Sequence, residues 1–327
     1  MRAVGAGSRR MRFVDLFCGC GGLSEGLRQA GWECVCALDD DPFALQLYAA
    51  NFPGEAAARH DLRRPLPDAP ALRKQLARGA LVGGPPCQDF ALTCANGKGA
   101  RGERAQLTCA FGEHVASLSP EWVIFENVKY AAHRPQFLAL LERLRALGYA
   151  AEHRVVSTRA LGMTQSRCRL ILLAHRERTA VEAAWRNVDA ALAGGPRPRT
   201  LRETFAEYGA PAPANHVYYP TPCARDVQPS VFSLDDRGER RAVFTVRGRA
   251  RPMPASYRFR PRDSTADRTD VFALAPAHLA ALQGFPREYA LHGPAGRLNQ
   301  ALGNAVPPPL ARLVAEAVAG VERDDVS

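Results

Sequence analysis

The sequence predicts an α/β fold, with a mostly parallel, doubly wound sheet and a smaller, loop-rich lobe. Between residues 11 and 175, short apolar runs alternate with segments of helical periodicity, as expected of parallel strands joined by helices. The first strand passes through a glycine-rich turn into a helix, an arrangement typical of nucleotide-binding sheets. The 327 residues suffice for one full core and one further lobe.

The elements of the first 200 residues follow from these apolar patterns. Strands are expected near residues 12–17, 34–39, 80–84, 121–126 and 169–174. Helices are expected near residues 23–30, 42–51 and 135–147, and a helix followed by a linker over 176–200. In the helix at 135–147, apolar residues recur at helical spacing, namely Phe137, Leu140, Leu141, Leu144 and Leu147.

The order of these elements predicts a large domain that is discontinuous in sequence. Residues 1–10 form a polar, glycine-rich leader, and residues 11–195 form most of the large domain. Residues 196–275 form the smaller lobe, and residues 276–327 return to complete the large domain with a helix near 309–321.

The glycine-rich turn is a candidate cofactor site. It reads Phe17-Cys18-Gly19-Cys20-Gly21-Gly22, and glycines let a ligand approach bare backbone at a helix N-terminus. The next apolar run ends in Asp39-Asp40-Asp41, where a carboxylate can hold ribose hydroxyls. The spacing is not GxGxxG, and many such turns bind nothing, so the pattern alone does not establish a site.

A stiff loop, Gly83-Gly84-Pro85-Pro86-Cys87-Gln88, follows the apolar run Ala80–Val82. Prolines restrict the backbone and glycines allow close approach, so the loop can hold one sulfur rigidly at the rim of a sheet. A buried, incidental cysteine in a tight turn explains the loop equally well. The loop alone leaves both interpretations open.

Composition narrows the function classes. No apolar run approaches the roughly 18–20 residues that cross a membrane, and residues 1–10 do not resemble a signal peptide. The nine cysteines predict a reducing compartment. Cys18, Cys20, Cys34 and Cys36 form two C-x-C pairs, which we interpret as core thiols because zinc sites favour C-x2-C spacing; no metal is expected.

Charge points to nucleic acid. The net charge is +10, and residues 196–275 hold 14 arginines against nine acidic residues. Arginines interleaved with aromatic residues suit phosphates and base edges, and the most basic stretch contains Arg247, Arg249 and Arg251. An excess of arginine that only keeps the protein soluble is the alternative.

An ordered set of motifs resembles the DNA cytosine-5 methyltransferases of restriction-modification systems. The motifs cover most of residues 11–318 and leave out mainly 196–275. They are DLFCGCGG at 15–22, the acidic tip at 39–41, PPCQ at 85–88, ENV at 126–128, QSRCR at 165–169, LQGFP at 282–286 and GNAVPP at 303–308. The resemblance implies a class I S-adenosylmethionine-dependent methyltransferase fold, with 11–195 and 276–327 catalytic and cofactor-binding and 196–275 the target-recognition domain.

Cytosine-5 methylation needs three contributions from a protein, because carbon 5 of cytosine is a poor nucleophile. A thiolate must add to carbon 6, an acid must serve the ring N3, and cations must stabilise charge on O2. Cys87, Glu126 and Arg169 are the right groups, and the resemblance assigns them these roles, with Arg167 beside them. Glu126 should have a pKa raised by burial. Arg167 and Arg169, two apart at a strand start, should point the same way.

The resemblance implies S-adenosylmethionine as the methyl donor. Phe17 would lie near the adenine, Gly19, Gly21 and Gly22 along the methionine part, Asp39 at the ribose and Asp61 at the adenine amino group. The complete expected set for the donor is Phe17, Gly19, Cys20, Gly21, Gly22, Asp39, Asp40, Asp61, Pro86, Leu107 and Asn304. A core phenylalanine and solvated aspartates are the alternatives.

The expected partner is double-stranded DNA, from which the target base must be extruded. Residues 89–107 are expected to form a mobile lid. The expected DNA contacts are Gln88, Lys98, Arg101, Arg104, Arg247, Arg249 and Arg251. A cognate restriction endonuclease would act separately on the same site. A monomer in the prokaryotic cytoplasm, at the nucleoid and without a membrane partner, is expected.

Two departures from the family pattern and two rival functions remain. Ala91 stands where the family usually has serine, and Tyr130 stands where small residues are frequent. The rival functions are tRNA cytosine-5 methylation and a catalytically silent DNA-binding regulator. The sequence lacks the Cys-Phe-Thr-x-x-Tyr motif of the related tRNA enzymes, and the intact Cys87, Glu126 and Arg169 argue against a silent protein.

Overall fold

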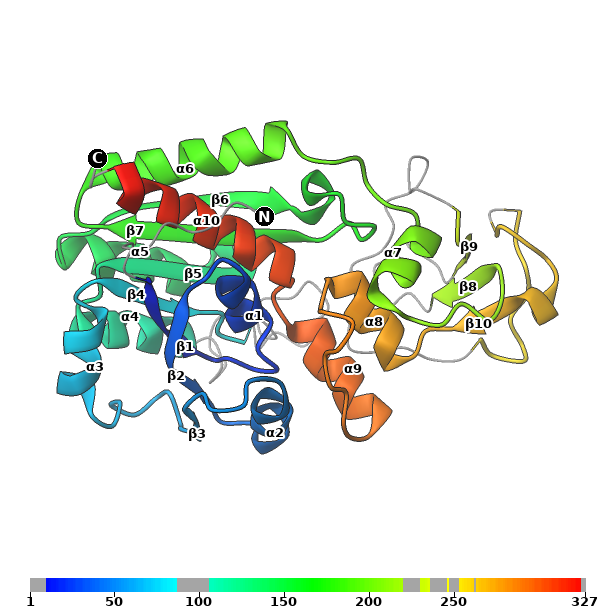
Figure 1. Ribbon diagram of the computed structural model, residues 1–327, viewed down its shortest axis with the longest axis horizontal. Coiled ribbons are helices and arrows are strands. Elements are labelled where there is room, and N and C mark those ends of the chain that lie inside the picture. The colour runs from blue at the N-terminus through cyan, green and yellow to red at the C-terminus, as the bar shows by residue number, and fades with distance from the viewer. Residues whose placement is uncertain are drawn as a thin grey trace.

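The computed structural model describes residues 10–86, 106–219, 230–235, 246, 253–261 and 263–324. It contains a seven-stranded sheet and a three-stranded sheet. The large sheet with its helices occupies one end of the molecule, and the small sheet with helices α7 and α8 occupies the other (Figure 1). Within the described residues, no helix is both long and apolar enough to cross a bilayer.

The large sheet has the strand order β3-β2-β1-β4-β5-β7-β6. Neighbouring strands run parallel except at β7, which is antiparallel to both β5 and β6. Its strands are β1 (Arg12–Leu16), β2 (Glu33–Asp39), β3 (Ala57–Arg59), β4 (Gly79–Gly83), β5 (Trp122–Val128), β6 (Ala150–Ser157) and β7 (Cys168–His175). This arrangement confirms the predicted α/β class and the mostly parallel sheet.

Helices cover both faces of this sheet. One face packs against α1 (Gly22–Gln29), α6 (Arg178–Ala193) and α10 (Pro308–Asp324). The opposite face packs against α3 (Ala69–Leu76), α4 (Gln106–Leu118) and α5 (Pro135–Ala146). Short 3-10 turns, η2 (Lys129–His133) and η3 (Thr158–Leu161), follow β5 and β6. The chain therefore returns through α10 to the domain in which it began.

Sequence explains where α2 (Pro42–Asn51) begins. Asp41 precedes the helix, and its carboxylate accepts a hydrogen bond of 2.9 Å from the backbone N–H of Phe43. Pro42 occupies the first turn, where its missing N–H costs nothing. This N-cap fixes the acidic tip of β2 beside the start of α2.

The second lobe contains β8 (His216–Tyr219), β9 (Ser230–Ser233) and β10 (Val271–Ala273), in the order β10-β8-β9. The helices α7 (Leu201–Tyr208), α8 (Pro276–Gln283) and α9 (Ala295–Asn304) and the turn η4 (Arg268–Asp270) accompany them. Buried residues of α2, α7, α8 and α9 share one apolar cluster with Val217 and Val246. This cluster joins the small sheet to the side of the large domain that carries the glycine-rich turn, because it also contains Cys18 and Cys20.

Candidate active site

A cavity of about 510 Å³ opens at the carboxyl ends of the parallel strands. The strand order reverses there, because β2 and β4 lie on opposite sides of β1, and open α/β sheets bind ligands at such switch points. Its lining includes Phe17–Cys20, Gly22, Asp39–Asp41, Asp61, Gly84–Pro86, Leu107, Glu126–Val128, Arg169 and Gly303–Val306. Of the described residues predicted to bind the cofactor, all but Gly21 line this cavity.

The glycine turn bends through left-handed backbone conformations. Phe17, Gly19 and Gly21 have φ angles of 64°, 55° and 83°. Among the described atoms, a side chain on Gly19 would meet only the backbone oxygen of Phe17, 4.0 Å away, so these residues leave open space beside Gly19. A Cβ on Gly21 would lie 2.2 Å from the Phe52 ring, so Gly21 is needed for packing behind the turn.

Gly22 joins the turn to the C-terminal part of the chain. A Cβ at this position would lie 2.2 Å from the backbone oxygen of Val306 and 3.1 Å from the Cβ of Ala305. Both of these residues also line the cavity. Only glycine therefore lets the GNAVPP segment close against the turn.

The three consecutive aspartates have different partners. Asp39 accepts hydrogen bonds from the backbone N–H groups of Gly19 at 2.8 Å and Asp41 at 2.9 Å. Asp40 pairs with Arg59 at 3.0 Å, and Asp41 caps α2 and pairs with Arg297 at 2.7 Å. Burial raises the pKa of Asp39, and the backbone N–H groups oppose that rise. Asp39 is thus the aspartate that is coupled directly to the glycine turn.

Asp61 reaches the cavity from the loop after β3. Its carboxylate accepts two hydrogen bonds from the Arg63 guanidinium, at 2.8 and 3.0 Å. The side-chain hydrogen bonds from Arg63 lower the pKa of Asp61 to about 2. Asp61 therefore stays ionised, as an acceptor for an amino group requires.

Glu126 and Arg169 form a buried ion pair in the same cavity. The Arg169 Nε lies 2.8 Å from Glu126 Oε1, and the two residues are 9 % and 7 % exposed. Antiparallel pairing of β5 with β7 brings them together across adjacent strands. Burial raises the pKa of Glu126, and the charges of Arg169 and Arg167 oppose that rise.

The Pro-Pro loop lies against this ion pair. A Cβ on Gly84 would be 3.0 Å from Glu126 Oε2, so the glycine lets the carboxylate approach the loop. The side chain of Asn127 donates a hydrogen bond of 3.1 Å to the backbone oxygen of Pro85. Asn127 was not selected from the sequence, although it stands inside the ENV motif that could have identified it.

Arg167 has a different position from Arg169. Its side chain is 1 % exposed and does not line the cavity. The guanidinium donates hydrogen bonds to the backbone oxygens of Val246, Gly303 and Ala305, at 2.9 to 3.1 Å. Arg167 and Arg169 therefore have different partners: Arg169 pairs with Glu126 in the cavity, whereas Arg167 holds the cavity wall at Gly303 and Ala305 and contacts the second lobe at Val246.

Two buried glutamines complete the wall behind the cavity. Gln165 donates to the backbone oxygen of Leu282 at 2.8 Å and to Gln283 Oε1 at 2.6 Å. Gln283 in turn donates to the backbone oxygen of Ala305 at 3.2 Å. Gln165 Oε1 also accepts the backbone N–H of Val246 at 3.2 Å. The QSRCR, LQGFP and GNAVPP motifs thus meet in one hydrogen-bond network.

Several predicted residues lie outside the described part of the chain. They are Cys87, Gln88, Lys98, Arg101, Arg104, Arg247, Arg249 and Arg251, together with Ala91. Pro86, which directly precedes Cys87 in the chain, lines the cavity. The loop expected over 89–107 ends earlier than predicted, because Gln106 and Leu107 already belong to α4.

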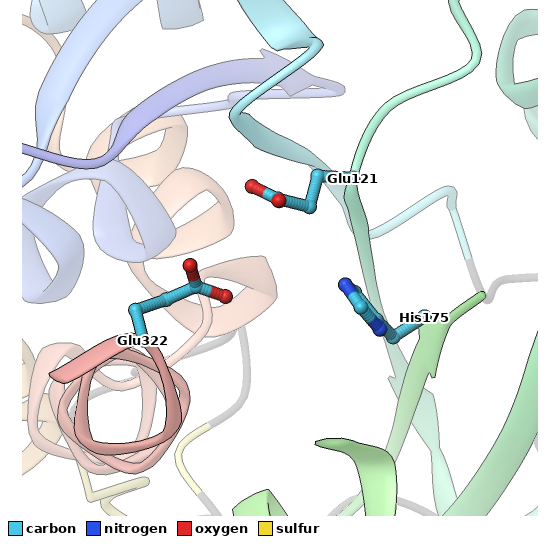
Figure 2. Close-up of side chains that lie close together, drawn as sticks. All are labelled: Glu121, His175 and Glu322. Carbon is cyan, nitrogen blue, oxygen red and sulfur yellow. The ribbon is translucent and has the colours of Figure 1, made fainter. Parts of the chain in front are cut away.

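The cysteine pairs and one distant cluster are the remaining candidates for metal ligands. Cys18 and Cys20 are buried, and burial raises the pKa of Cys20 to about 12, as expected of core thiols. In the described part of the chain, the group with potential ligand atoms within 4.8 Å of one another is Glu121, His175 and Glu322, shown in Figure 2.

Hydrogen bonds hold two members of this cluster in place. The backbone N–H of Glu177 donates to His175 Nδ1 at 3.1 Å, so a neutral ring carries its proton on Nε2. Trp122 donates to Glu322 Oε1 at 2.8 Å. Burial and the neighbouring Glu322 carboxylate raise the pKa of Glu121 to about 7. The cluster therefore ties the end of α10 to the sheet, far along the strands from the cavity.

Comparisons with known proteins agree with this geometry. A family described as C-5 cytosine-specific DNA methylase matches residues 11–193 and 234–320. The chain is 33 % identical over 307 residues to the Type II methyltransferase M.HgiDI of Herpetosiphon aurantiacus, covering 93 % of each protein. It is 29 % identical over 320 residues to the Type II methyltransferase M.HindV of Haemophilus influenzae, covering 97 % of this chain and 99 % of the relative.

Solved structures share the fold at lower identity. A putative DNA modification methyltransferase encoded within an Escherichia coli prophage superposes with a TM-score of 0.64 at 19 % identity, over 96 % of this chain and 99 % of that one. The Dnmt2 methyltransferase of S. pombe superposes with a TM-score of 0.63 at 17 % identity, over 96 % and 99 %. These likenesses support the fold class.

Proposed function

This chain belongs to the C-5 cytosine-specific DNA methylases, and we propose that it methylates an extruded cytosine through a covalent Cys87 adduct, with S-adenosylmethionine as the donor. The enzyme class, a DNA cytosine-5 methyltransferase of restriction-modification type, follows from the family and its relatives. The observation that supports the finer proposal is one cavity that unites the glycine turn, the Glu126–Arg169 pair and the loop before Cys87.

The donor site would be formed by the glycine turn and two aspartates. Gly19 borders open space and leaves room for a ligand against the backbone, while Asp39 and Asp61 supply acceptors for hydroxyl and amino groups. Phe17 adds an aromatic face to the same wall. When bound there, S-adenosylmethionine supplies an electrophilic methyl group.

Cys87 would supply the nucleophile. Its thiolate adds to carbon 6 of cytosine, and the ring electrons then move toward carbon 5, which becomes able to attack an electrophile. After loss of the carbon 5 proton, the sulfur leaves and the aromatic ring is restored. The target base must leave the duplex first, because carbon 6 is otherwise enclosed in the stack.

Glu126 and Arg169 would stabilise the ring during this addition. Glu126 Oε1 is held by Arg169, whereas Oε2 is turned to Gly84 and the loop that carries Cys87. Burial favours a protonated or proton-sharing Glu126, which suits donation to the ring N3. Arg169 would place positive charge near O2. Arg167 would act indirectly, by holding the wall at Gly303 and Ala305.

Residues 196–275 would choose the DNA sequence. The segment is rich in arginine, and its Val246 backbone is fixed by Gln165 and Arg167 next to Arg247. A fixed backbone at this point would present the following arginines to base edges or phosphates. A restriction endonuclease with the same target would be the separate partner of such a Type II enzyme.

Transfer of tritiated methyl groups tests the proposal. Wild-type protein should label duplex DNA in preference to tRNA, and Cys87→Ser should lose the label while still binding donor and DNA. Cys109→Ser is the matched control, because Cys109 is an exposed free thiol in α4. Preferential labelling of tRNA, or turnover by Cys87→Ser, would contradict the proposal, and bisulfite sequencing would locate the modified base.

A further inference from the structure

A buried polar network lies behind the glycine turn, away from the cavity. Asp15 of β1, Ser24 of α1 and Tyr48 of α2 are each 0 % exposed. Ser24 Oγ lies 2.6 Å from Asp15 Oδ2 and 3.0 Å from Tyr48 Oη. Tyr48 Oη also lies 2.9 Å from Glu55 Oε2 and 3.6 Å from Cys34 Sγ. One chain of polar atoms therefore links three elements that meet at the turn.

This network touches the turn directly. Ser24 lies in the first turn of α1, two residues after Gly22. A Cβ on Gly21 would be 3.1 Å from the Tyr48 ring and 2.2 Å from Phe52, one helical turn further along. Any movement of Tyr48 would therefore be transmitted to the backbone of the turn, because the packing there leaves no free space.

Counting protons shows that the network is one proton short. Three contacts between oxygen atoms link Asp15, Ser24, Tyr48 and Glu55, whereas Ser24 and Tyr48 bring only two protons. A carboxyl group must supply the third. Glu55 already forms an ion pair with Arg28, with 3.2 Å between Arg28 Nε and Glu55 Oε1. Asp15 makes no ion pair among the described residues, and its Oδ1 is buried without a hydrogen-bond partner, which suits a neutral acid better than a charged one.

We propose that Asp15 is a positioning residue for donor binding, which holds the glycine turn in place as a neutral carboxylic acid donating to Ser24. The inference rests on the proposed function, because it concerns the S-adenosylmethionine site. The chain of donors then runs from Asp15 through Ser24 and Tyr48 to Glu55, and every contact is satisfied. Ionised Asp15 would leave one contact without a proton and would loosen the turn.

The surroundings of Asp15 favour the neutral form. Burial, together with the carboxylates of Asp39 on β2 and Glu55 after α2, raises the pKa of Asp15 to about 7, although hydrogen bonds from Ser24 oppose the rise. The thiols of Cys18, Cys34 and Cys36 face the same group and have pKa values raised by burial, so they remain neutral. Donor affinity should therefore be constant below pH 7 and fall above it.

Calorimetry with S-adenosylmethionine between pH 6 and pH 9.5 tests the inference. Wild-type affinity should weaken above pH 7, approaching tenfold per pH unit. Asp15→Asn keeps a neutral donor to Ser24, so its affinity at pH 6 should stay within about threefold of wild type and its profile should be flat. Ser24→Ala should bind weakly already at pH 6. Asp39 cannot produce this pattern, because its ionisation would strengthen donor binding as pH rises.

The calorimetric results distinguish failure of the inference from failure of the proposed function. A flat wild-type profile, or an alkaline loss that persists in Asp15→Asn, would overturn the inference while leaving the proposed function intact. Absence of binding by wild type at every pH would overturn the proposed function and the inference with it. Infrared spectroscopy gives a second measurement: wild type at pH 6 should show a protonated carboxyl band that is lost by pH 9 and that is missing from Asp15→Asn. Glu121, whose pKa is also raised to about 7, contributes a band of its own, so the comparison with Asp15→Asn carries the test. Identical carboxyl bands in the two proteins at pH 6 would refute a neutral Asp15.

Discussion

Gly22→Ala should separate the two walls of the cavity without touching a proposed catalytic group. The added Cβ would lie 2.2 Å from the backbone oxygen of Val306 and 3.3 Å from the Phe285 ring. Normal van der Waals contact begins near 3.4 Å, so the Val306 backbone must move by about 1 Å. That movement would displace the segment that closes against the glycine turn.

The size of this displacement sets the expected losses of stability and of donor affinity in Gly22→Ala. Overpacking of this kind costs roughly 1–3 kcal/mol, so the melting temperature should fall by about 2–8 °C. A 1 Å displacement of a binding wall can cost about a hundredfold, so the affinity for S-adenosylmethionine should fall by roughly tenfold to a hundredfold. Scanning calorimetry and titration calorimetry on the same preparation measure both quantities.

Gly296→Ala provides the matched control. Gly296 lies in helix α9, and an added Cβ would have no atom of the described residues within 4 Å. Alanine is the better helix former there, so stability should be unchanged or rise by up to about 1 kcal/mol, with unchanged donor affinity. If Gly22→Ala behaved like Gly296→Ala, the close contact between the turn and Val306 would be absent in solution and the reasoning would fail.

Three further substitutions test individual groups. Glu126→Gln should lower the methyl-transfer rate at least about a hundredfold yet stay folded, because glutamine still accepts from Arg169; a smaller loss would rule out an acid role. Asp39→Ala should weaken donor binding roughly tenfold to a hundredfold, whereas Asp40→Ala should not; the reverse order would misplace the ribose contact. Glu121, whose pKa is raised to about 7, destabilises the fold as pH rises from about 4.5 through 7. Glu121→Gln should therefore raise the melting temperature at pH 8 but not at pH 4. Because the residue is only partly buried, we expect about 1 kcal/mol, and an equal shift at both pH values would contradict the assignment.

Apolar patterns were sufficient for the central strands and for helices α1, α2, α5 and α6, whereas α3 and α4 were not predicted. β1, β4 and β5 are largely buried and mainly apolar, although β1 contains Asp15 and β5 contains Glu126 and Asn127. Helix α2 has the predicted bounds 42–51. β6 was missed because an edge strand with partly exposed faces can be polar, as Glu152, His153 and Arg154 are. β3, with three residues, carries too little pattern to detect.

The motifs predicted most of the residues of the candidate site, but they did not predict the different roles of these residues. Motif positions placed Asp39, Glu126 and Arg169 around one cavity, as expected. Arg167 could not be separated from Arg169 by sequence, because its distinct role depends on carbonyl groups more than a hundred residues away. The role that we propose for Asp15 depends on its contacts with α1 and α2. No pattern in the sequence around Asp15 indicates that its carboxyl group is protonated.

Covalent trapping tests the central claim most directly. Duplex DNA carrying 5-fluorocytosine at the methylated position should form a complex with wild-type protein that survives denaturation, because fluorine at carbon 5 cannot be lost as a proton is. The complex should require S-adenosylmethionine, form with Cys109→Ser and be absent with Cys87→Ser. Methylation of the unmodified duplex without any trapped complex, or trapping by Cys87→Ser, would contradict a covalent mechanism through Cys87.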